Sequence, residues 1–90
     1  MQPEKFELKQ NYPNPFNPST MIYYQLPMIN EVDLSIYNVL GQKIVTLVKG
    51  KRETGEHQIE WDASGFASGV YYYQLVAGDY REVKKMILLR

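Results

Sequence analysis

Apolar and polar residues alternate with a period of two along most of this chain. In residues 31–37, Val32, Leu34 and Ile36 alternate with polar or amphipathic residues. Successive side chains of a β-strand point to opposite faces, so this pattern predicts a strand whose three aliphatic residues enter a core. Similar patterns predict strands at residues 6–8, 20–26, 43–49, 56–61, 70–77 and 80–89. No window shows a 3.6-residue period over the length of a helix, and we therefore expect an all-β fold.

The alternation also predicts which side chains share a face of their strand. The expected sets are Ile22 with Tyr24 and Leu26, Ile44 with Thr46 and Val48, His57 with Ile59 and Trp61, Tyr71 with Tyr73 and Leu75, and Met86 with Leu88 opposite Ile87 and Leu89. A last set of aromatic residues is expected on outer faces, namely Tyr23, Tyr37, Tyr72 and Tyr80. These outer aromatics allow two interpretations: weak stacking on sugar rings, or cross-strand pairing on a solvated face, which we favour.

Turn-forming residues separate the predicted strands. Gly41 suits a positive φ after the strand at 31–37, and Gly78-Asp79 predicts a two-residue hairpin of the primed type. Residues 50–55 are expected to form a charged loop, and residues 62–69 a turn-rich crossover between sheets. About seven short strands with such spacing predict a two-sheet antiparallel sandwich of immunoglobulin-like type. Ninety residues fit one domain, which we expect to span residues 1–90.

A Pro-rich stretch at residues 10–20 interrupts the alternation. Its prolines at 13, 15 and 18 fix φ and remove amide donors, which predicts a stiff connector rather than a helix or a central strand. Tyr12 and Phe16 are large side chains within this connector, and we expect them to pin it to the core. Asn14 and Asn17 are expected to close Asx-type turns onto nearby amides.

Composition excludes several classes of function. Lys and Arg together number ten and so do Asp and Glu, which argues against nucleic acid as a partner, because nucleic-acid binding usually needs a basic face. The chain has no cysteine, so disulfides and thiolate metal sites are excluded. No apolar run approaches the roughly 20 residues of a membrane helix. The first residues lack the pattern of a signal peptide, and for an exported parent we expect that signal upstream.

Catalytic and metal-binding candidates are sparse. His57 is the only histidine and has no second ligand at metal spacing, so a structural role is favoured. Asp62 is expected to cap a turn rather than act as a base. Asn11, Asn14, Asn17 and Asp62 could together offer oxygen ligands to Ca²⁺, but turn formation is the better interpretation. We therefore predict no catalytic residue, no metal and no cofactor, and expect that the chain is not an enzyme.

Several motifs of the chain resemble one family in combination. The Pro-rich stretch resembles the opening of type A C-terminal sorting domains of the type IX (Por) secretion system, and also the related immunoglobulin-like domain of the flagellar hook-capping protein. Further similar segments are 32–38 with Gly41-Gln42, 55–57 leading to Trp61-Asp62, 67–73 and 84–90. The motif residues expected to be structural are Asn11, Pro13, Asn14, Pro15, Phe16, Asn17, Pro18, Gly41, Trp61, Gly69 and Tyr71.

This resemblance implies a role in export. Domains of this family follow a parent protein and are recognised by the outer-membrane secretion machinery, which delivers the parent to the cell surface or the medium. The terminal strand is suited to edge recognition by strand addition. We expect the recognised surface to include residues of that strand, namely Lys84, Lys85, Met86, Leu88 and Arg90. The alternative is an accessory carbohydrate-binding or structural immunoglobulin-like module of an extracellular enzyme or surface assembly.

Overall fold

The computed structural model describes residues 4–90, which form seven strands and no helix. The strands are β1 (Glu7–Leu8), β2 (Ser19–Leu26), β3 (Asn30–Tyr37), β4 (Lys43–Arg52), β5 (Gly55–Asp62), β6 (Gly69–Ala77) and β7 (Tyr80–Leu88). Each predicted strand is therefore present, with ends that shift by one to three residues. No helix within residues 4–90 is long and apolar enough to cross a membrane.

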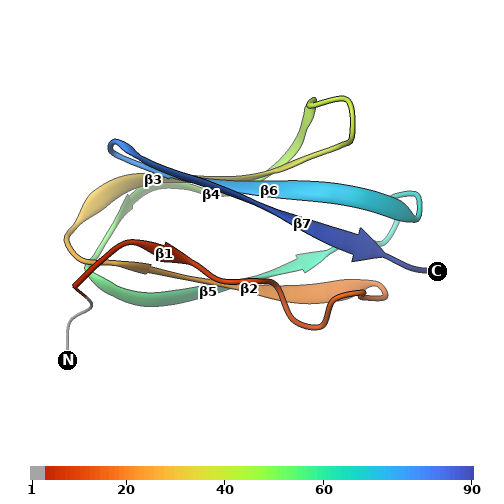
Figure 1. Cartoon of the computed structure of the whole chain (residues 1–90), viewed down its shortest axis with the longest axis horizontal. Coiled ribbons are helices and arrows are strands. Elements are labelled where there is room, and N and C mark those ends of the chain that lie inside the picture. The colour runs from red at the N-terminus through yellow and green to blue at the C-terminus, as the bar shows by residue number, and fades with distance from the viewer. Residues whose placement is uncertain (1–3) are drawn as a thin grey trace.

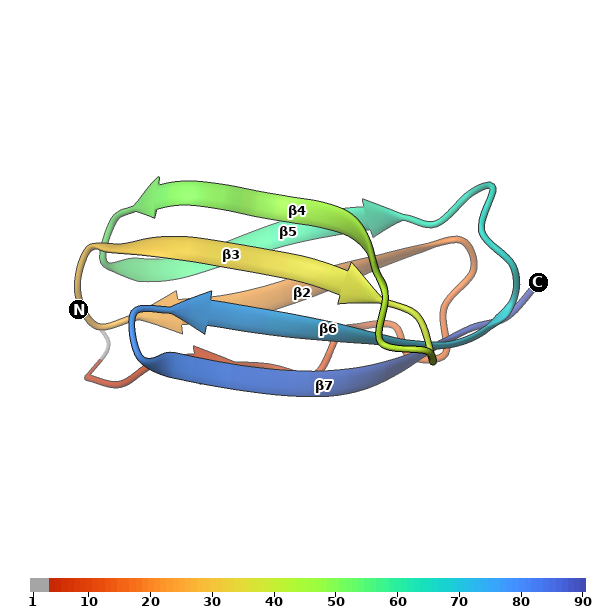
Figure 2. The same ribbon diagram turned by 90° about the horizontal axis from the view of Figure 1, so that it is seen from above.

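The strands form two antiparallel sheets that pack face to face (Figure 1). One sheet has the order β1-β2-β5 and the other β4-β3-β6-β7. Figure 2 shows the four-stranded sheet from above, with β5 and β2 beneath it. The crossover after β5 carries the chain from the three-stranded sheet to the four-stranded one, as predicted. The predicted two-sheet sandwich is confirmed.

Inward-facing side chains of both sheets fill the space between them. Ile22 and Leu26 of β2 are fully buried, and so are Leu34 and Ile36 of β3 and Leu75 of β6. Their outward neighbours are more exposed, because the side-chain period of a strand is two. The predicted faces of β2, β3, β5 and β6 are confirmed, and this burial is the main favourable contribution to stability.

Strand β4 departs from the predicted alternation. The register slips twice along its pairing with β3, so Val48 faces Leu34 and Val45 faces Ile36, while Thr46 faces Ser35 on the outer side. Each slip is a β-bulge that places one extra residue on β4. The prediction that Ile44, Thr46 and Val48 share a face was therefore wrong. The predicted charged loop at 50–55 was also too long, because β4 continues to Arg52 and β5 begins at Gly55.

The β6–β7 hairpin turns at Gly78-Asp79, as predicted. Gly78 has a φ of 61° and Asp79 does not have a positive φ, which is the pattern of a type II′ turn. Opposite Ala77, Tyr80 faces inward and stacks on Phe6 with ring centroids 5.0 Å apart. The prediction that Tyr80 lies on an outer face was wrong, because a two-residue turn sets the register so that Tyr80 shares the face of buried Ala77.

Candidate functional site at the C-terminal strand

The Pro-rich segment (residues 10–18) is hydrogen-bonded to the outer edge of β7. The amide of Phe16 donates to the carbonyl of Ile87 at 3.0 Å, and the amide of Leu89 donates to the carbonyl of Phe16 at 2.9 Å. The Asn14 side chain accepts a hydrogen bond from the Ile87 amide at 2.9 Å. An edge strand otherwise exposes a row of unpaired amides and carbonyls. The Pro-rich segment thus covers the C-terminal half of the β7 edge.

A second set of contacts holds the Pro-rich segment in shape. Asn11 is buried, and its side-chain nitrogen donates to the Thr20 hydroxyl at 2.9 Å and to the Pro13 carbonyl at 3.2 Å. Thr20 in turn donates to the same Pro13 carbonyl at 2.9 Å. A buried amide without hydrogen-bond partners would be costly, and these bonds avoid that cost. Asn11 therefore has a structural role, which is to link Pro13 and Thr20.

The Tyr73 hydroxyl ties β6, the neighbour of β7 in the four-stranded sheet, to the start of the same segment. It accepts a hydrogen bond from the Asn11 amide and donates one to the Lys9 carbonyl, each at 2.7 Å. Burial raises the pKa of Tyr73 to about 12, against the opposing effect of the Asn11 hydrogen bond. The phenol is therefore neutral at physiological pH and can act as donor and acceptor at once.

Four aromatic side chains close the end of the sandwich near the C-terminus. Trp61 of β5 lies against Phe16, Phe66 of the crossover and Tyr71 of β6, with ring centroids 5.4 to 5.8 Å apart. The Tyr71 hydroxyl donates to the Ala67 carbonyl at 2.6 Å. Tilted and edge-on rings of this kind contribute beyond the area that they bury. Phe16 is thus both a core residue and the anchor of the Pro-rich segment, which confirms its predicted pinning role. The same role predicted for Tyr12 was wrong, because that side chain is 75% exposed.

Arg90 fastens the end of the chain to the crossover. Its Nε atom donates to the Phe66 carbonyl at 2.8 Å, and its Nη2 atom donates to the Ala63 carbonyl at 2.9 Å. Ala63 itself donates from its amide to Pro18 at 2.9 Å. The crossover, the Pro-rich segment and the last residue of the chain therefore form one connected set of contacts.

The five residues expected in the recognised surface lie in different surroundings. The side chains of Met86 and Leu88 are fully buried in the core. Lys84 faces inward and is half-buried, with its Nζ atom 3.7 Å from a carboxylate oxygen of Glu82. Lys85 is exposed on the outer face, and Arg90 is exposed but engaged with the crossover. Of the five, only Lys85 thus offers an exposed side chain that has neither an ion-pair partner nor a hydrogen-bond partner within residues 4–90.

The other motif residues mostly occupy turns. Gly41 has a φ of 81°, a conformation that suits glycine, in a turn where the Asn38 side chain accepts hydrogen bonds from the amides of Leu40 and Gln42. Gly69 begins β6 with a φ of 146°. Pro15 and Asn17 are exposed. Within residues 4–90, the Asn17 side chain does not make the hydrogen bond of the predicted Asx-type turn. The amide oxygen of Asn14 bonds Ile87, which is far away in sequence, instead of a nearby amide.

The outer face of the four-stranded sheet carries a hollow beside Lys85. Tyr37 and Tyr72 pair across β3 and β6, and with Gly41, Gln74 and Val83 they line a hollow of about 230 Å³. The Tyr37 hydroxyl donates to the Gln74 side chain at 3.2 Å. The cross-strand pairing predicted for the outer aromatics is confirmed for this pair. Lys85 pairs with Tyr72 and lies on the same outer face.

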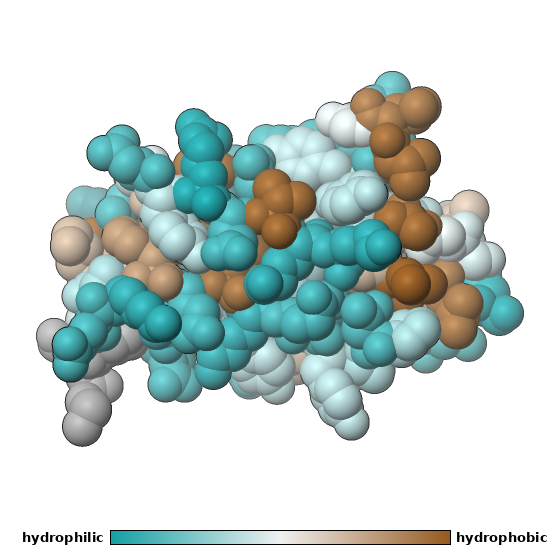
Figure 3. All heavy atoms as spheres, viewed as in Figure 1, coloured by the Kyte–Doolittle hydropathy of each residue, from teal (hydrophilic) through white to brown (hydrophobic). Residues whose placement is uncertain are grey.

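The remaining outer aromatics do not extend this pair into a row. Tyr23 lies on the three-stranded sheet, which is on the other side of the sandwich, and Tyr80 faces inward. Apolar side chains gather instead on the projecting loop between β3 and β4 (Figure 3), where Val39 and Leu40 are exposed. The aromatic residues are therefore not arranged to flank a single sugar chain.

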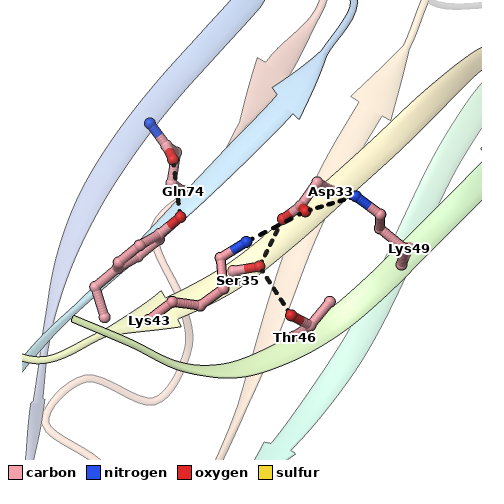
Figure 4. A network of polar contacts seen from close by, with 7 residues as sticks. Asp33, Ser35, Lys43, Thr46, Lys49 and Gln74 are labelled. Carbon is pink, nitrogen blue, oxygen red and sulfur yellow. Dashed lines mark hydrogen bonds and ion pairs between the residues drawn. The ribbon is translucent and has the colours of Figure 1, made fainter. Parts of the chain in front are cut away.

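A charged network covers the same outer face nearer the centre of β3 (Figure 4). An Asp33 carboxylate oxygen lies 3.3 Å from Nζ of Lys49 and 3.5 Å from Nζ of Lys43. The Ser35 hydroxyl donates to the other carboxylate oxygen at 2.5 Å, and these neighbours cover Ser35 completely although it faces outward. Partial burial raises the pKa of Asp33, but the hydrogen bonds and the two lysines outweigh it and leave that pKa below its ordinary value.

Replacing Asp33 with Asn is expected to destabilise the domain by about 1 kcal/mol at neutral pH. Because the pKa of Asp33 is lowered by folding, its contribution is present above the ordinary value of 3.8 and is lost as the pH falls through the lower folded value. Urea unfolding at several pH values measures this, with Glu31→Gln on the same strand as the control. A difference between wild type and Asp33→Asn that stays constant into strong acid would contradict the assignment.

The lone histidine and the turn aspartate have structural contacts. His57 stacks on Tyr24 with ring centroids 5.1 Å apart, and its Nε2 atom is 2.8 Å from the Glu53 carbonyl. Asp62 accepts hydrogen bonds from the hydroxyl and the amide of Ser64, which lower its pKa and confirm the predicted turn cap. Within residues 4–90, no group of three or more His, Asp or Glu side chains is placed to hold a metal ion.

Sequence reasoning missed the bridge made by Tyr73. Its partners Lys9 and Asn11 precede it by 64 and 62 residues, so no local spacing connects them. The one available signal was the position of the tyrosine on the inner face of a strand, because a buried phenol needs a hydrogen-bond partner.

The fold and these contacts show that the molecule is a small antiparallel β-sandwich. Its Pro-rich segment and its C-terminal strand are joined by hydrogen bonds. The family of secretion system C-terminal sorting domains matches residues 10–89, a range that includes both parts of this contact, and the chain belongs to that family. It is a sorting signal that directs type IX secretion of a parent protein to the cell surface or the medium. Members of this family are non-catalytic signal modules. No curated protein and no solved structure matches the chain.

Proposed function

We propose that the secretion machinery recognises this chain as a single folded, non-enzymatic sorting domain, through the outer face of its four-stranded sheet next to β7. Lys85 is the central contact of this surface. The hollow lined by Tyr37, Tyr72 and Val83 lies beside it. A parent protein that precedes the domain is carried with it.

The observation that carries this proposal is the exposure of Lys85 on a strand that is held rigidly from both sides. β7 pairs with β6 along its whole length, and the Pro-rich segment bonds its other edge at Ile87 and Leu89. A rigid strand presents its side chains in one arrangement, which lowers the entropy cost of binding. Met86 and Leu88 contribute by anchoring this strand in the core, and Arg90 by fixing its end.

The test is a fusion of the domain to an exported reporter in a host with type IX machinery. We expect Lys85→Glu to lower the surface-delivered fraction of the reporter severalfold, because a rim charge affects encounter with a partner more than it affects folding. The matched control is Lys5→Glu, which makes the same charge change at an exposed residue outside this surface. Equal delivery of both variants, with unchanged urea midpoints, would exclude Lys85 as a contact.

A further inference from the structure

The sandwich has four edge strands, and three of them are poorly suited to accept another strand. β1 has only two residues, and β4 carries two bulges. The Pro-rich segment covers the C-terminal half of the β7 edge. In the other half of β7, the charged side chains of Glu82 and Lys84 point inward. Short strands, bulges and inward charges are common means of blocking edge-to-edge pairing.

β5 is the exception. It pairs with β2 in unbroken register over eight residues, and its other edge has no neighbouring strand among residues 4–90. Two contacts show which residues of β5 direct their backbone groups toward β2. The Ala63 amide donates to the Pro18 carbonyl, and Met21 bonds to Tyr12 at the edge of β2 that lies away from β5. Because the backbone groups of alternate residues face opposite edges, the odd-numbered residues of β5 face β2. The amides and carbonyls of Glu56, Gln58 and Glu60 therefore point away, and within residues 4–90 they have no hydrogen-bond partner.

The side chains along this edge select the occupant. Glu56, Gln58, Glu60 and Asp62 are exposed on the outer face, so a strand added to β5 meets three carboxylates in alternate positions. Opposite charges across neighbouring strands stabilise pairing, and like charges oppose it. Two copies of β5 would bring these carboxylates together, which disfavours a second copy of this chain as the partner.

The inner face at this edge favours apolar side chains. Ile59 of β5 faces Ile22, and Val45 of β4 faces Ile36, yet both are only partly buried because they lie on the outermost strands of the two sheets. Inward side chains of an added strand would cover them. An occupant that alternates basic and apolar residues therefore satisfies both faces.

We propose that the open edge of β5 binds an extended basic segment of a partner protein by strand addition. This site is distinct from the β7 surface and does not depend on the sorting interaction. Backbone hydrogen bonds supply the affinity, and the carboxylates of Glu56 and Glu60 supply the preference for Lys or Arg at alternate positions.

The test uses a labelled short peptide of alternating lysine and valine, and a control peptide of alternating glutamate and valine, with binding measured by fluorescence anisotropy. We expect the basic peptide to bind and the acidic control peptide not to bind. Binding of the basic peptide should weaken at high salt. The double variant Glu56→Lys with Glu60→Lys should weaken binding by about tenfold. The matched control, Glu31→Lys with Asp79→Lys, makes the same net charge change away from β5 and should bind as wild type does.

A backbone variant separates strand addition from simple charge attraction. Gln58→Pro removes an amide that points away from β2, a position where edge strands tolerate proline, so the fold is retained. It should abolish binding of the basic peptide, while Gln58→Ala should not, and peptide-induced amide shifts in NMR spectra should centre on residues 56–60. Equal binding by the two variants, or shifts centred on β4 or β7, would overturn the proposal. So would self-association of the free domain through residues 56–60.

Discussion

Replacing Phe16 with Ala is expected to lower the free energy of unfolding by about 3–4 kcal/mol. Phe16 is 2% exposed and lies against Trp61, so truncation leaves a cavity in the aromatic cluster. The loss also releases the anchor of the Pro-rich segment, whose backbone at this residue holds Ile87 and Leu89. Urea unfolding measures the change.

Hydrogen exchange shows whether the Phe16 effect spreads to the edge of β7. In the variant, the amides of Leu89 and residue 16 should exchange faster than those of β3, because the segment can detach without global unfolding. Tyr12→Ala is the control, since Tyr12 belongs to the same segment but is 75% exposed. A large loss of stability with unchanged relative protection at Leu89 would show that Phe16 acts only as a core residue.

Replacing Tyr73 with Phe is expected to cost about 1–3 kcal/mol at neutral pH, although only one oxygen is removed. The ring remains in the core, but the buried amide of Asn11 and the carbonyl of Lys9 lose their common partner. Exchange of the Asn11 amide should rise accordingly. Tyr80→Phe is the matched control, because it removes the same oxygen from β7, where the Tyr80 hydroxyl donates to Glu82 and contacts neither Lys9 nor Asn11.

The alkaline pH dependence of stability gives a second readout for Tyr73. Folding raises the pKa of Tyr73 from 10.0 to about 12, so its contribution is complete below pH 10.0 and is lost as the pH rises toward the folded value. Tyr80, whose pKa is raised to about 12 by burial and by Glu82, adds a similar loss. Stability should therefore fall less steeply with pH in Tyr73→Phe than in wild type. Parallel curves for the two proteins would contradict the assignment.

These two variants bear on the sorting function through the same contacts. Phe16 holds the Pro-rich segment against β7, and Tyr73 of the neighbouring strand β6 holds the start of that segment. If recognition requires β7 in its folded arrangement, both variants should deliver less reporter than their controls do. They should do so at temperatures at which the domain as a whole remains folded.

The period-two pattern was sufficient to predict the strands and most of their faces, because burial of one face of a strand depends on local alternation. Val32, Leu34 and Ile36 illustrate this: their spacing alone places them in the core. The pattern failed in β4 and at Tyr80. In both cases the face is decided by the register with the neighbouring strand, through two bulges in β4 and through the hairpin turn before Tyr80.

By itself, the sequence determined the two-sheet class, the stiffness of the Pro-rich segment and the family, since each depends on residue type and near spacing. The tertiary structure alone decided that Asn14 covers β7, that Tyr73 bonds Lys9 and Asn11, and that β5 keeps an open edge. These contacts join residues far apart along the chain or depend on which strands become neighbours. Local side-chain preferences contain no information on either, because chain closure and sheet order are fixed only when the two layers pack.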